Sequence, residues 1–373
     1  MSKKIKKAPR PKTSPDYAFI IVVGLLVIFG LVMLASASSD LAKEQFGNSY
    51  FYLKHQLVYG LSFGVLGFAV TSFIYHQRFR KIATILLAIN IVALILVFTP
   101  LGMSIKGATR WLEIGGFSFQ PGEFLKLTFL IYLASWLSKK KSRTKSFGEG
   151  FVPFLILLGG VTFLLIIQPS TTTAAILLLV SLAVYFMSGA KIKFIIGSIL
   201  LVVFVLSLLI YFTPYRMQRI TTFINPEAEP LGSSYHINQS LNAVGSGGLT
   251  GVGYGQSTTK LNYLPEPIGD SIFAVIGEEL GFIGAIGLLL LFLTLAWRGF
   301  IIAKNTPDTF GQLLVIGFTS TIALQALVNI GAISGFLPLT GVPLPFISYG
   351  GTALAVFMTM SGIIVNVSKY RRK

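Results

Sequence analysis

A series of long apolar runs constrains the fold of this chain more than any other feature. The runs recur from one end of the 373 residues to the other, so that 53% of the residues are hydrophobic and only 12% are charged. A helix of about 20 apolar residues crosses the roughly 30 Å of hydrocarbon in a membrane. Such a helix also satisfies its own backbone hydrogen bonds there. The sequence therefore predicts an all-α polytopic membrane protein.

We expect ten membrane-spanning helices, at 17–37, 51–74, 82–100, 119–137, 150–168, 172–188, 192–212, 271–297, 309–335 and 350–367. The fourth range is the least hydrophobic and the sixth is short, so both are expected to face protein or a cavity rather than lipid. The connection 213–270, between the seventh and eighth helices, is by far the longest. Long ordered loops are uncommon unless they carry a function, so we expect the functional residues to concentrate there.

Basic residues are divided unevenly between the two sets of loops. Of the 30 Lys and Arg residues, 22 fall on the side that holds both termini and 6 on the other side. Because cytoplasmic loops carry the excess of Lys and Arg, both termini are predicted to be cytoplasmic. The expected organisation is a basic tail 1–16, a membrane domain 17–367 and a second basic tail 368–373. The net charge of +17 then reflects topology, and no nucleic-acid partner is expected.

The long loop is rich in glycine and polar residues. Glycines cluster at 245–248 and 251–255, where they either let the backbone approach a bulky anionic ligand or simply form turns. His236 and Gln239 precede these clusters. We count both among the candidate substrate-binding residues.

Charged residues of the same loop suggest phosphate binding and acid–base chemistry. Arg216, Arg219 and Lys260 are candidates for neutralising a phosphate. Asp270 closes the loop where the chain re-enters the membrane, and a carboxylate in that low dielectric is a candidate general base. The alternative is that Asp270 only caps the next helix, because Asp is a favoured N-cap residue.

Ionisable residues inside the expected spans are a second set of candidates. Glu123 and Lys126 are three residues apart, so they share a helix face and can pair. Glu278 and Glu279 lie early in the eighth span. Charges at membrane depth are expensive and usually functional. The alternative is a buried ion pair that holds helices together.

Two further outer segments could contact a substrate. Arg110, beside Trp111, either clamps a lipid phosphate or anchors the chain at the membrane interface. The last outer loop has prolines at 338, 343 and 345, which force non-helical backbone at membrane depth. That backbone either lines a cavity, with Ser348 as a candidate contact, or is a stiff connector.

Several chemistries are not expected. The three histidines lie in different segments without metal-ligand spacing, so we predict no metal-binding residues of the zinc type. There is no cysteine, which excludes disulfides and thiol catalysis. No nucleotide-binding glycine motif follows a predicted strand. The sequence leaves open a divalent cation, Mg²⁺ or Mn²⁺, that would assist a phosphate leaving group.

Taken together, these motifs resemble the SEDS family (shape, elongation, division and sporulation), whose members include FtsW and RodA. The resemblance runs over nearly the whole chain after the basic tail. It rests on motifs at 36–39, 107–111, 115–116, 120–126, 225–226, 239–240, 251–255, 264–266, 276–281 and 343–351. The segments at 36–39, 110–111 and 251–255 look more like the division branch (FtsW) than the elongation branch (RodA).

The resemblance implies ten helices and a peptidoglycan glycosyltransferase in the bacterial cytoplasmic membrane. It implies polymerisation of lipid II, with a class B penicillin-binding protein and other divisome proteins as partners. Asp270 aligns with the aspartate thought essential in the family, and Glu123 with Lys126 matches polar residues facing its central cavity. Ser170 departs from the family pattern by replacing an acidic residue. The segment 267–269 departs by lacking a His-Thr pair before the aspartate.

Three functions follow as hypotheses. In the first, Asp270 takes a proton from the sugar 4-hydroxyl of lipid II, which attacks the growing strand with inversion. In the second, the protein is a lipid II flippase whose polar cavity only conducts headgroups. In the third, it is a divisome scaffold without chemistry. A transporter needs polar groups through the membrane depth, whereas the candidate residues concentrate on the outer side.

Overall fold

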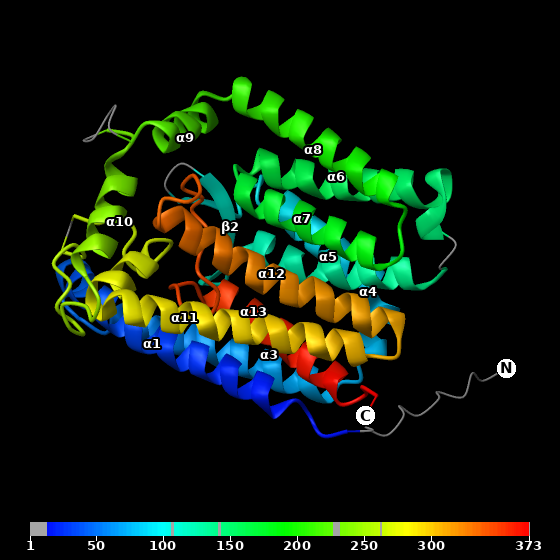
Figure 1. The fold of residues 1–373 in the computed structure, drawn as a ribbon, viewed down its shortest axis with the longest axis horizontal. Coiled ribbons are helices and arrows are strands. Elements are labelled where there is room, and N and C mark those ends of the chain that lie inside the picture. Colours follow the sequence, from blue (N-terminus) through cyan, green and yellow to red (C-terminus); the bar gives the residue numbers. More distant parts are fainter. Residues whose placement is uncertain (1–12, 106–107, 141–142, 227–231, 262, 373) are drawn as a thin grey trace.

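The computed structural model describes residues 13–105, 108–140, 143–226, 232–261 and 263–372. Long helices run side by side along one axis (Figure 1). The prediction of an all-α membrane fold is confirmed. Most of the basic tail 1–16 lies outside the described residues.

A helix lies in each of the ten predicted ranges. In chain order these helices are α1 (Tyr17–Phe46), α2 (Phe51–His55) continued by η1 (Gln56–Leu61) and α3 (Ser62–Phe73), α4 (Gln77–Leu96), α5 (Pro121–Ser138), η3 (Phe147–Phe151) continued by α6 (Val152–Ile167), α7 (Thr171–Met187), α8 (Ile192–Tyr211), α11 (Ile272–Asn305), α12 (Thr309–Ile333) and α13 (Gly351–Ser368). A short helix, η2 (Arg143–Lys145), precedes η3.

Eight helical segments of the described chain are long and apolar enough to cross a membrane. The two predicted spans outside this set are α5, the least hydrophobic, and α7, which has 17 residues. A count of ten membrane crossings therefore stays a prediction.

The connection between α4 and α5 contains a small antiparallel sheet that the sequence analysis did not predict. Its strands are β1 (Gly102–Ile105), β2 (Ala108–Ile114) and β3 (Phe117–Phe119), in the order β1-β2-β3. Gly115 and Gly116 join β2 to β3 with φ of 60° and 80°. Two successive positive φ values are what a tight hairpin turn requires, and glycine adopts them without strain.

The loop 213–270 contains two helices, α9 (Pro214–Ile224) and α10 (Tyr235–Ser246). Together with β2, they lie at one end of the bundle, which we call the cavity end (Figure 1). At the other end, which we call the termini end, Thr13 donates a hydrogen bond from its hydroxyl to the carbonyl of Ser368, at 3.0 Å. The two ends of the described chain therefore lie on the same side.

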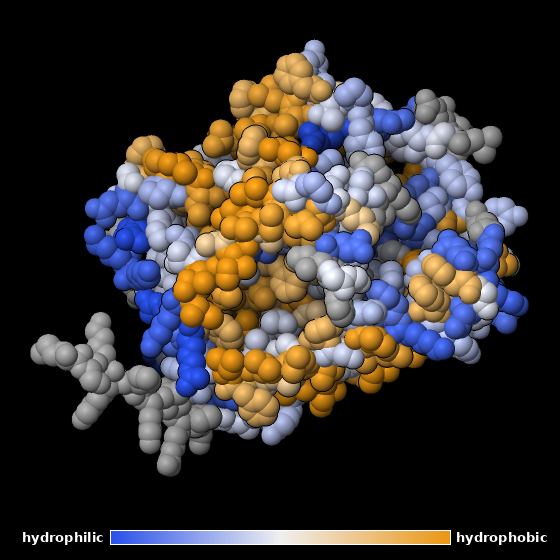
Figure 2. Space-filling view, turned by 180° about the vertical axis from the view of Figure 1, so that it is seen from behind, coloured by the Kyte–Doolittle hydropathy of each residue, from blue (hydrophilic) through white to orange (hydrophobic). Residues whose placement is uncertain are grey.

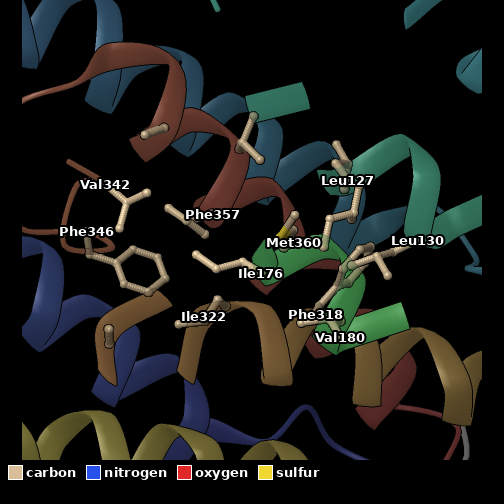
Figure 3. Packing of buried hydrophobic residues seen from close by; sticks show 14 of the residues in the cluster. Leu127, Leu130, Ile176, Val180, Phe318, Ile322, Val342, Phe346, Phe357 and Met360 are labelled. Atoms are coloured by element: carbon tan, nitrogen blue, oxygen red, sulfur yellow. The ribbon is translucent and has the colours of Figure 1, made fainter. Parts of the chain in front are cut away.

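The helices differ in how deeply they are buried. In α13, 83% of the apolar stretch is buried and in α12 67%, whereas in α8 only 17% is buried. The centre of the bundle is packed by side chains of α5, α7, α12 and α13 and of the loop before α13 (Figure 3). Apolar side chains also cover the middle of the surface, with hydrophilic ones toward both ends (Figure 2). This distribution fits a bundle surrounded by lipid.

Helix α11 is broken near its start, which the sequence analysis did not anticipate. Gly281 has φ 63° and ψ −163°, so a short helix from Ile272 ends there and a longer one continues to Asn305. Glu278 and Glu279 thus belong to a short helix at the cavity end. The longer part of α11 extends beyond the predicted end at residue 297.

Candidate active site

A cavity of about 250 Å³ opens at the cavity end of the bundle. It lies between α9, α10, the turn before α11 and the loop after α12. Its walls are formed by Tyr215, Gln218, Arg219, Thr222, Phe223, Ser233, His236, Ile237, Asp270, Leu337, Leu339 and Gly341. Three of the predicted site residues, Arg219, His236 and Asp270, therefore meet in one cavity.

Asp270 is not the N-cap of α11. The helix begins at Ile272, and its N-cap residue is Ser271. The hypothesis that Asp270 serves only as a helix cap is therefore wrong, because the residue lies one position too early. Asp270 lies instead on the wall of the cavity.

The backbone around Asp270 is held by three successive carbonyl groups. The carbonyl of Ile268 accepts from the amide of Tyr349 at 2.8 Å, and that of Gly269 accepts from the hydroxyl of Ser348 at 2.6 Å. The carbonyl of Asp270 accepts from the side-chain amide of Asn329 at 2.8 Å. Ser348, a predicted substrate contact, thus positions the turn before Asp270.

Arg219 faces Asp270 across Gly341. An ideal Cβ built on Gly341 lies 3.7 Å from Asp270 Oδ2 and 3.8 Å from Arg219 Nη2. Gly341 has φ +64°, so a side chain here would be strained as well as intrusive. Arg219 also donates to the carbonyl of Leu339 at 2.9 Å and to the hydroxyl of Tyr215. A carboxylate and a guanidinium thus share the cavity without forming an ion pair.

Arg110 and Arg216 extend the positive charge beyond the cavity. Arg216, on α9, donates to the hydroxyl of Thr171 at 3.2 Å. Arg110, on β2, donates to the carbonyls of Gln168, at 3.1 Å, and Pro169. Burial lowers the pKa of Arg110, the nearby Tyr215 raises it, and the charge of Arg219 lowers it.

The three arginines share one property. In the described part of the chain, none of them has a carboxylate within ion-pair distance. Their hydrogen-bond acceptors are neutral carbonyl and hydroxyl oxygens. A cluster of arginines without anionic partners is suited to a phosphate or pyrophosphate ligand.

The two predicted site residues of α10, His236 and Gln239, differ in their position relative to the cavity. His236 Nε2 lies 2.7 Å from the hydroxyl of Ser271, the residue after Asp270. Gln239 is half-buried on the same helix and is not one of the described cavity residues. His236 is therefore placed to contact a ligand, whereas nothing in the geometry brings Gln239 to it.

Lys260 does not line this cavity. Its ammonium lies 2.9 Å from Glu279 Oε1 and 3.1 Å from the hydroxyl of Ser36, and the residue is 6% exposed. A buried ammonium that already has a carboxylate partner gains little from a phosphate, so the geometry argues against the predicted phosphate contact. Lys260 instead ties the loop 213–270 to α1 and α11.

The neighbouring Glu278 has a similar structural role. It accepts hydrogen bonds from the hydroxyl of Ser257 at 2.5 Å and from the amide of Thr258 at 3.0 Å. The amide and the hydroxyl of Thr259 donate to the same carboxylate. Glu278 and Glu279 therefore fix the segment 255–260, which supports the structural alternative for this pair.

The segment that holds the glycine clusters is docked, in part, against the protein's own backbone. At the break in α11, the amides of Val252 and Gly253 donate to the carbonyls of Glu278 (2.9 Å) and Glu279 (3.1 Å). In return, the amide of Phe282 donates to the carbonyl of Gly248 at 2.9 Å. The loop thus replaces the helical hydrogen bonds that the break removes.

This docking explains why two of these positions are glycine. A Cβ on Gly251 would lie 2.1 Å from the carbonyl oxygen of Glu279, and one on Gly247 would lie 2.0 Å from that of Gly277. No side chain fits at those distances. The prediction that these glycines let a bulky ligand approach is therefore wrong for Gly247 and Gly251.

Glu123 and Lys126 lie in the bundle centre. They pair at 2.8 Å and are 3% and 1% exposed. Lys126 also donates to Gln325 Oε1 at 2.7 Å and lies over the ring of Phe357. Neither residue lines the cavity, so a direct substrate contact is not what their position supports.

The sequence analysis missed four polar residues near the site. Thr171 holds Arg216, and Thr172 donates to the carbonyl of Thr340 at 2.8 Å. Gln325 and Asn329, one turn apart on α12, donate to the carbonyls of Pro343 and Val342, both at 2.8 Å. Amides inside an apolar span were the signal that could have identified the last two.

No metal centre is formed by the protein alone in the part of the chain that the structure describes. It contains no group of three or more His, Cys, Asp or Glu side chains arranged to hold an ion. A divalent cation at Asp270 would need further ligands from its substrate.

Comparison with known proteins places these features in a family. The model of the cell cycle protein family of FtsW, RodA and SpoVE matches residues 16–373. Stage V sporulation protein E of Bacillus subtilis is 41% identical over 364 residues, which cover 97% of this chain and 99% of that protein. The probable peptidoglycan glycosyltransferase FtsW of Trichlorobacter lovleyi is 38% identical over 354 residues, which cover 95% of this chain and 93% of that protein.

Two solved structures are similar over nearly their whole length. A chain from a peptidoglycan synthase complex that coordinates polymerization and crosslinking matches with a TM-score of 0.80 and 26% identity, covering 96% of this chain and 99% of that chain. The rod shape determining protein RodA of Thermus thermophilus matches with a TM-score of 0.72 and 27% identity. That match covers 98% of this chain and 100% of that chain.

Proposed function

Because the chain belongs to the FtsW, RodA and SpoVE family of cell cycle proteins, the SEDS family, we propose that it is a peptidoglycan glycosyltransferase acting in cell division. It polymerises lipid II into glycan strands at the outer face of the bacterial cytoplasmic membrane. One observation carries the proposal. Asp270 and Arg219 share a cavity of about 250 Å³, and Arg110 and Arg216 lie beyond it with no carboxylate of the described residues within ion-pair distance.

The reaction is an inverting sugar transfer. Asp270 takes the proton of the acceptor's sugar 4-hydroxyl as its oxygen forms a bond to the anomeric carbon of the growing strand. The bond from that carbon to the lipid pyrophosphate breaks, and the electron pair leaves with the pyrophosphate. One displacement converts an α-linked donor into a β-1,4 linkage.

The arginines stabilise the leaving group. Negative charge develops on the pyrophosphate as the glycosidic bond breaks, and fixed positive charges in a poorly solvated site act most strongly there. Arg219 is placed nearest the carboxylate, across Gly341. Arg110 and Arg216 are held by neutral oxygens and remain able to bind an anion.

An apolar cavity supports a lipid-linked substrate. It has a volume of about 350 Å³ and lies between α6, α7 and α8, with walls that are almost entirely hydrocarbon. Thr171 lines this cavity and also accepts the hydrogen bond from Arg216. Thr171 thus lies between the apolar cavity and Arg216, which places the cavity beside the arginine cluster, as a prenyl chain joined to a pyrophosphate requires.

The two rival functions are less well supported by the geometry. A flippase needs polar groups that a headgroup can follow through the membrane, but the central Glu123 and Lys126 are buried and paired with each other. A scaffold needs no carboxylate on the wall of a cavity.

Partners and location follow from the same proposal. A class B penicillin-binding protein supplies the crosslinking activity, and the similar chain from a complex for polymerization and crosslinking supports this partner.

With both termini cytoplasmic, a reporter fused after Lys373 is expected inside the cell and one inserted near Ser234 outside. A C-terminal reporter found outside would overturn the ten-span topology.

The decisive experiment replaces Asp270 by Asn. Formation of glycan strands from lipid II is measured with the purified variant and its penicillin-binding partner. Loss of a general base typically reduces a rate by about 10² to 10⁴, and we expect this loss with an unchanged melting temperature. The matched control is Asp40→Asn, which removes an exposed carboxylate.

The outcome separates the hypotheses. A stable Asp270→Asn variant that polymerises at more than about a tenth of the wild-type rate would remove Asp270 from the general-base role. Wild-type protein that moves lipid II across vesicles but forms no strands would favour the flippase.

A further inference from the structure

We propose that Asn329, on α12, is a positioning residue that holds Asp270 in its reactive place, and that Gln325 assists it. The inference rests on the proposed function, because it assigns the positioning of the same carboxylate. Asp270 lies in a turn directly before α11, and a reacting group must be held in a fixed position for catalysis.

Asn329 connects two segments through one NH₂ group. Its Nδ2 donates to the carbonyl of Asp270 and to the carbonyl of Val342, both at 2.8 Å. The residue is 1% exposed. Its Oδ1 has no hydrogen-bond partner among the described residues. The side chain therefore acts through its donor group, and the two carbonyl acceptors fix which way the amide points.

Gln325 makes the equivalent contact one turn earlier. Its Nε2 donates to the carbonyl of Pro343 at 2.8 Å, and its Oε1 accepts from Lys126 at 2.7 Å. Residues four apart on a helix share a face. Gln325 and Asn329 therefore hold two consecutive carbonyls of the loop between α12 and α13, which we call the proline-rich loop. Lys126, paired with Glu123, fixes the other end of the Gln325 amide.

Of the three described residues that donate to the carbonyls of residues 268–270, Asn329 alone lies on a helix. The other two, Ser348 and Tyr349, belong to the proline-rich loop that Asn329 and Gln325 themselves hold. Removing the amide of Asn329 thus releases the turn directly, through Asp270, and indirectly, through the loop. A displacement of about 1 Å in a reacting group can reduce a rate 10²-fold.

A simple structural role is the alternative, since a buried amide that satisfies two carbonyls also stabilises the fold. The matched control is Asn366, on α13 at the termini end. It too is 1% exposed, and it donates to the carbonyl of Ser72 at 2.8 Å and accepts from the amide of His76 at 2.9 Å. Substitution of either residue removes a buried amide, but only one touches Asp270.

The experiment compares Asn329→Ala with Asn366→Ala in the full chain with its partner. For Asn329→Ala we expect kcat to fall about 10- to 100-fold, with KM for lipid II changed less than about threefold. Both substitutions should lower the melting temperature by a similar amount, because each removes a buried amide. Asn366→Ala, however, should leave kcat within about twofold. Ser348→Ala, which releases only the carbonyl of Gly269, should lower kcat in the same direction but less.

Hydrogen exchange gives a readout that does not depend on activity. The amides of Gly269 and Ser271 both donate to the carbonyl of Glu266, at 3.0 and 3.2 Å. In Asn329→Ala these amides should exchange faster, while peptides from the termini end keep their rates. Unchanged exchange in residues 264–271 would overturn the proposal, even if activity were lost.

A double variant shows whether Asn329 acts through Asp270. In an Asp270→Asn background, Asn329→Ala should cause little further loss, because residues that act as a unit are not additive. An equal fold-loss in both backgrounds would overturn the proposal. If Asp270→Asn alone kept its activity, the proposed role of Asp270 as general base would fail, whereas the exchange experiment would still decide whether Asn329 holds the turn.

Discussion

The two ends of the bundle differ in how their arginines are held. At the termini end, Asp16 is paired with Arg298 and with Arg371, each at 2.6 Å, and Asp308 lies 3.0 Å from His76 Nε2. At the cavity end, by contrast, three arginines are held by neutral oxygens, and the nearby Asp270 is not their ion-pair partner.

This difference separates charges that build the structure from charges that serve a ligand. Asp16 joins three helix ends, since it caps α1 and binds arginines from α11 and from the chain after α13. Such a site is complete without a ligand. The arginine cluster is not complete in this sense, because guanidinium groups gain most from an anion. Under the proposed function, the pyrophosphate of the substrate is the anion that completes the cluster.

The largest expected effect comes from breaking the Glu123–Lys126 ion pair, which lies between the termini end and the cavity end. Lys126→Met leaves Glu123 uncompensated in the bundle centre, which typically costs about 3 to 5 kcal/mol when a buried pair is broken. We expect lower membrane abundance, a lower melting temperature and lost polymerisation. The control is Lys140→Met, which breaks an exposed pair with Glu149 of 3.1 Å and should cost no more than about 1 kcal/mol. Normal abundance and normal activity in Lys126→Met would show that the central pair is dispensable.

A pair of matched substitutions tests the comparison directly. Arg219→Gln should lower kcat/KM for lipid II about 10- to 100-fold, because a hydrogen bond to a charged group contributes about 1.5 to 3 kcal/mol. Its melting temperature should stay the same. Arg298→Gln should do the reverse, with lower stability and near-normal kcat/KM. Steady-state kinetics and thermal unfolding of both variants provide the measurement, and identical behaviour of the two would break the distinction between the ends.

The smallest expected effect is a loss of stability in acid that originates at the termini end. Burial raises the pKa of Asp16, but hydrogen bonds from Arg298, Phe19 and Arg371 outweigh it and hold the net pKa below the usual value. Burial also raises the pKa of Asp308, but the hydrogen bond and the charge of His76 lower it, and the net pKa is again below the usual value. A lowered carboxyl pKa stabilises the folded state above about pH 3.9, the unfolded value, and this stabilisation is lost as the pH falls through the folded pKa.

The measurement is the melting temperature of the detergent-solubilised protein between neutral pH and about pH 3, where the stabilisation is lost. The decline in acid should be shallower in the double variant Asp16→Asn, Asp308→Asn. An equally steep decline in that variant would assign the acid sensitivity to other carboxylates.

The sequence predicted best where the physical cause is local. A run of apolar residues long enough to cross a membrane has one stable conformation there, so every predicted range holds a helix. The break at Gly281 and the small sheet were missed. The first depends on a loop more than twenty residues earlier supplying hydrogen bonds to the broken helix, and the second lies in a connection whose length and glycines alone do not specify a sheet.

The candidate site residues show the same difference between features with a local cause and features that depend on distant contacts. Asp270, Arg219 and His236 were identified from their motifs and their place in one loop, and the structure brings them to one cavity. Lys260 was chosen on the same grounds, but its ammonium pairs with Glu279 and Ser36. Its sequence neighbours contain nothing that reveals those partners.

The sequence by itself determined the membrane fold, the common side of the bundle on which both termini lie and the loop that carries Asp270. These properties follow from hydropathy, from the unequal distribution of basic residues and from short motifs, all of which are local. Only the tertiary structure decided which charges are free to meet a ligand. Whether a Lys or an Arg is already neutralised depends on contacts such as that of Lys260 with Ser36, 224 residues away, and these exist only once the helices have packed.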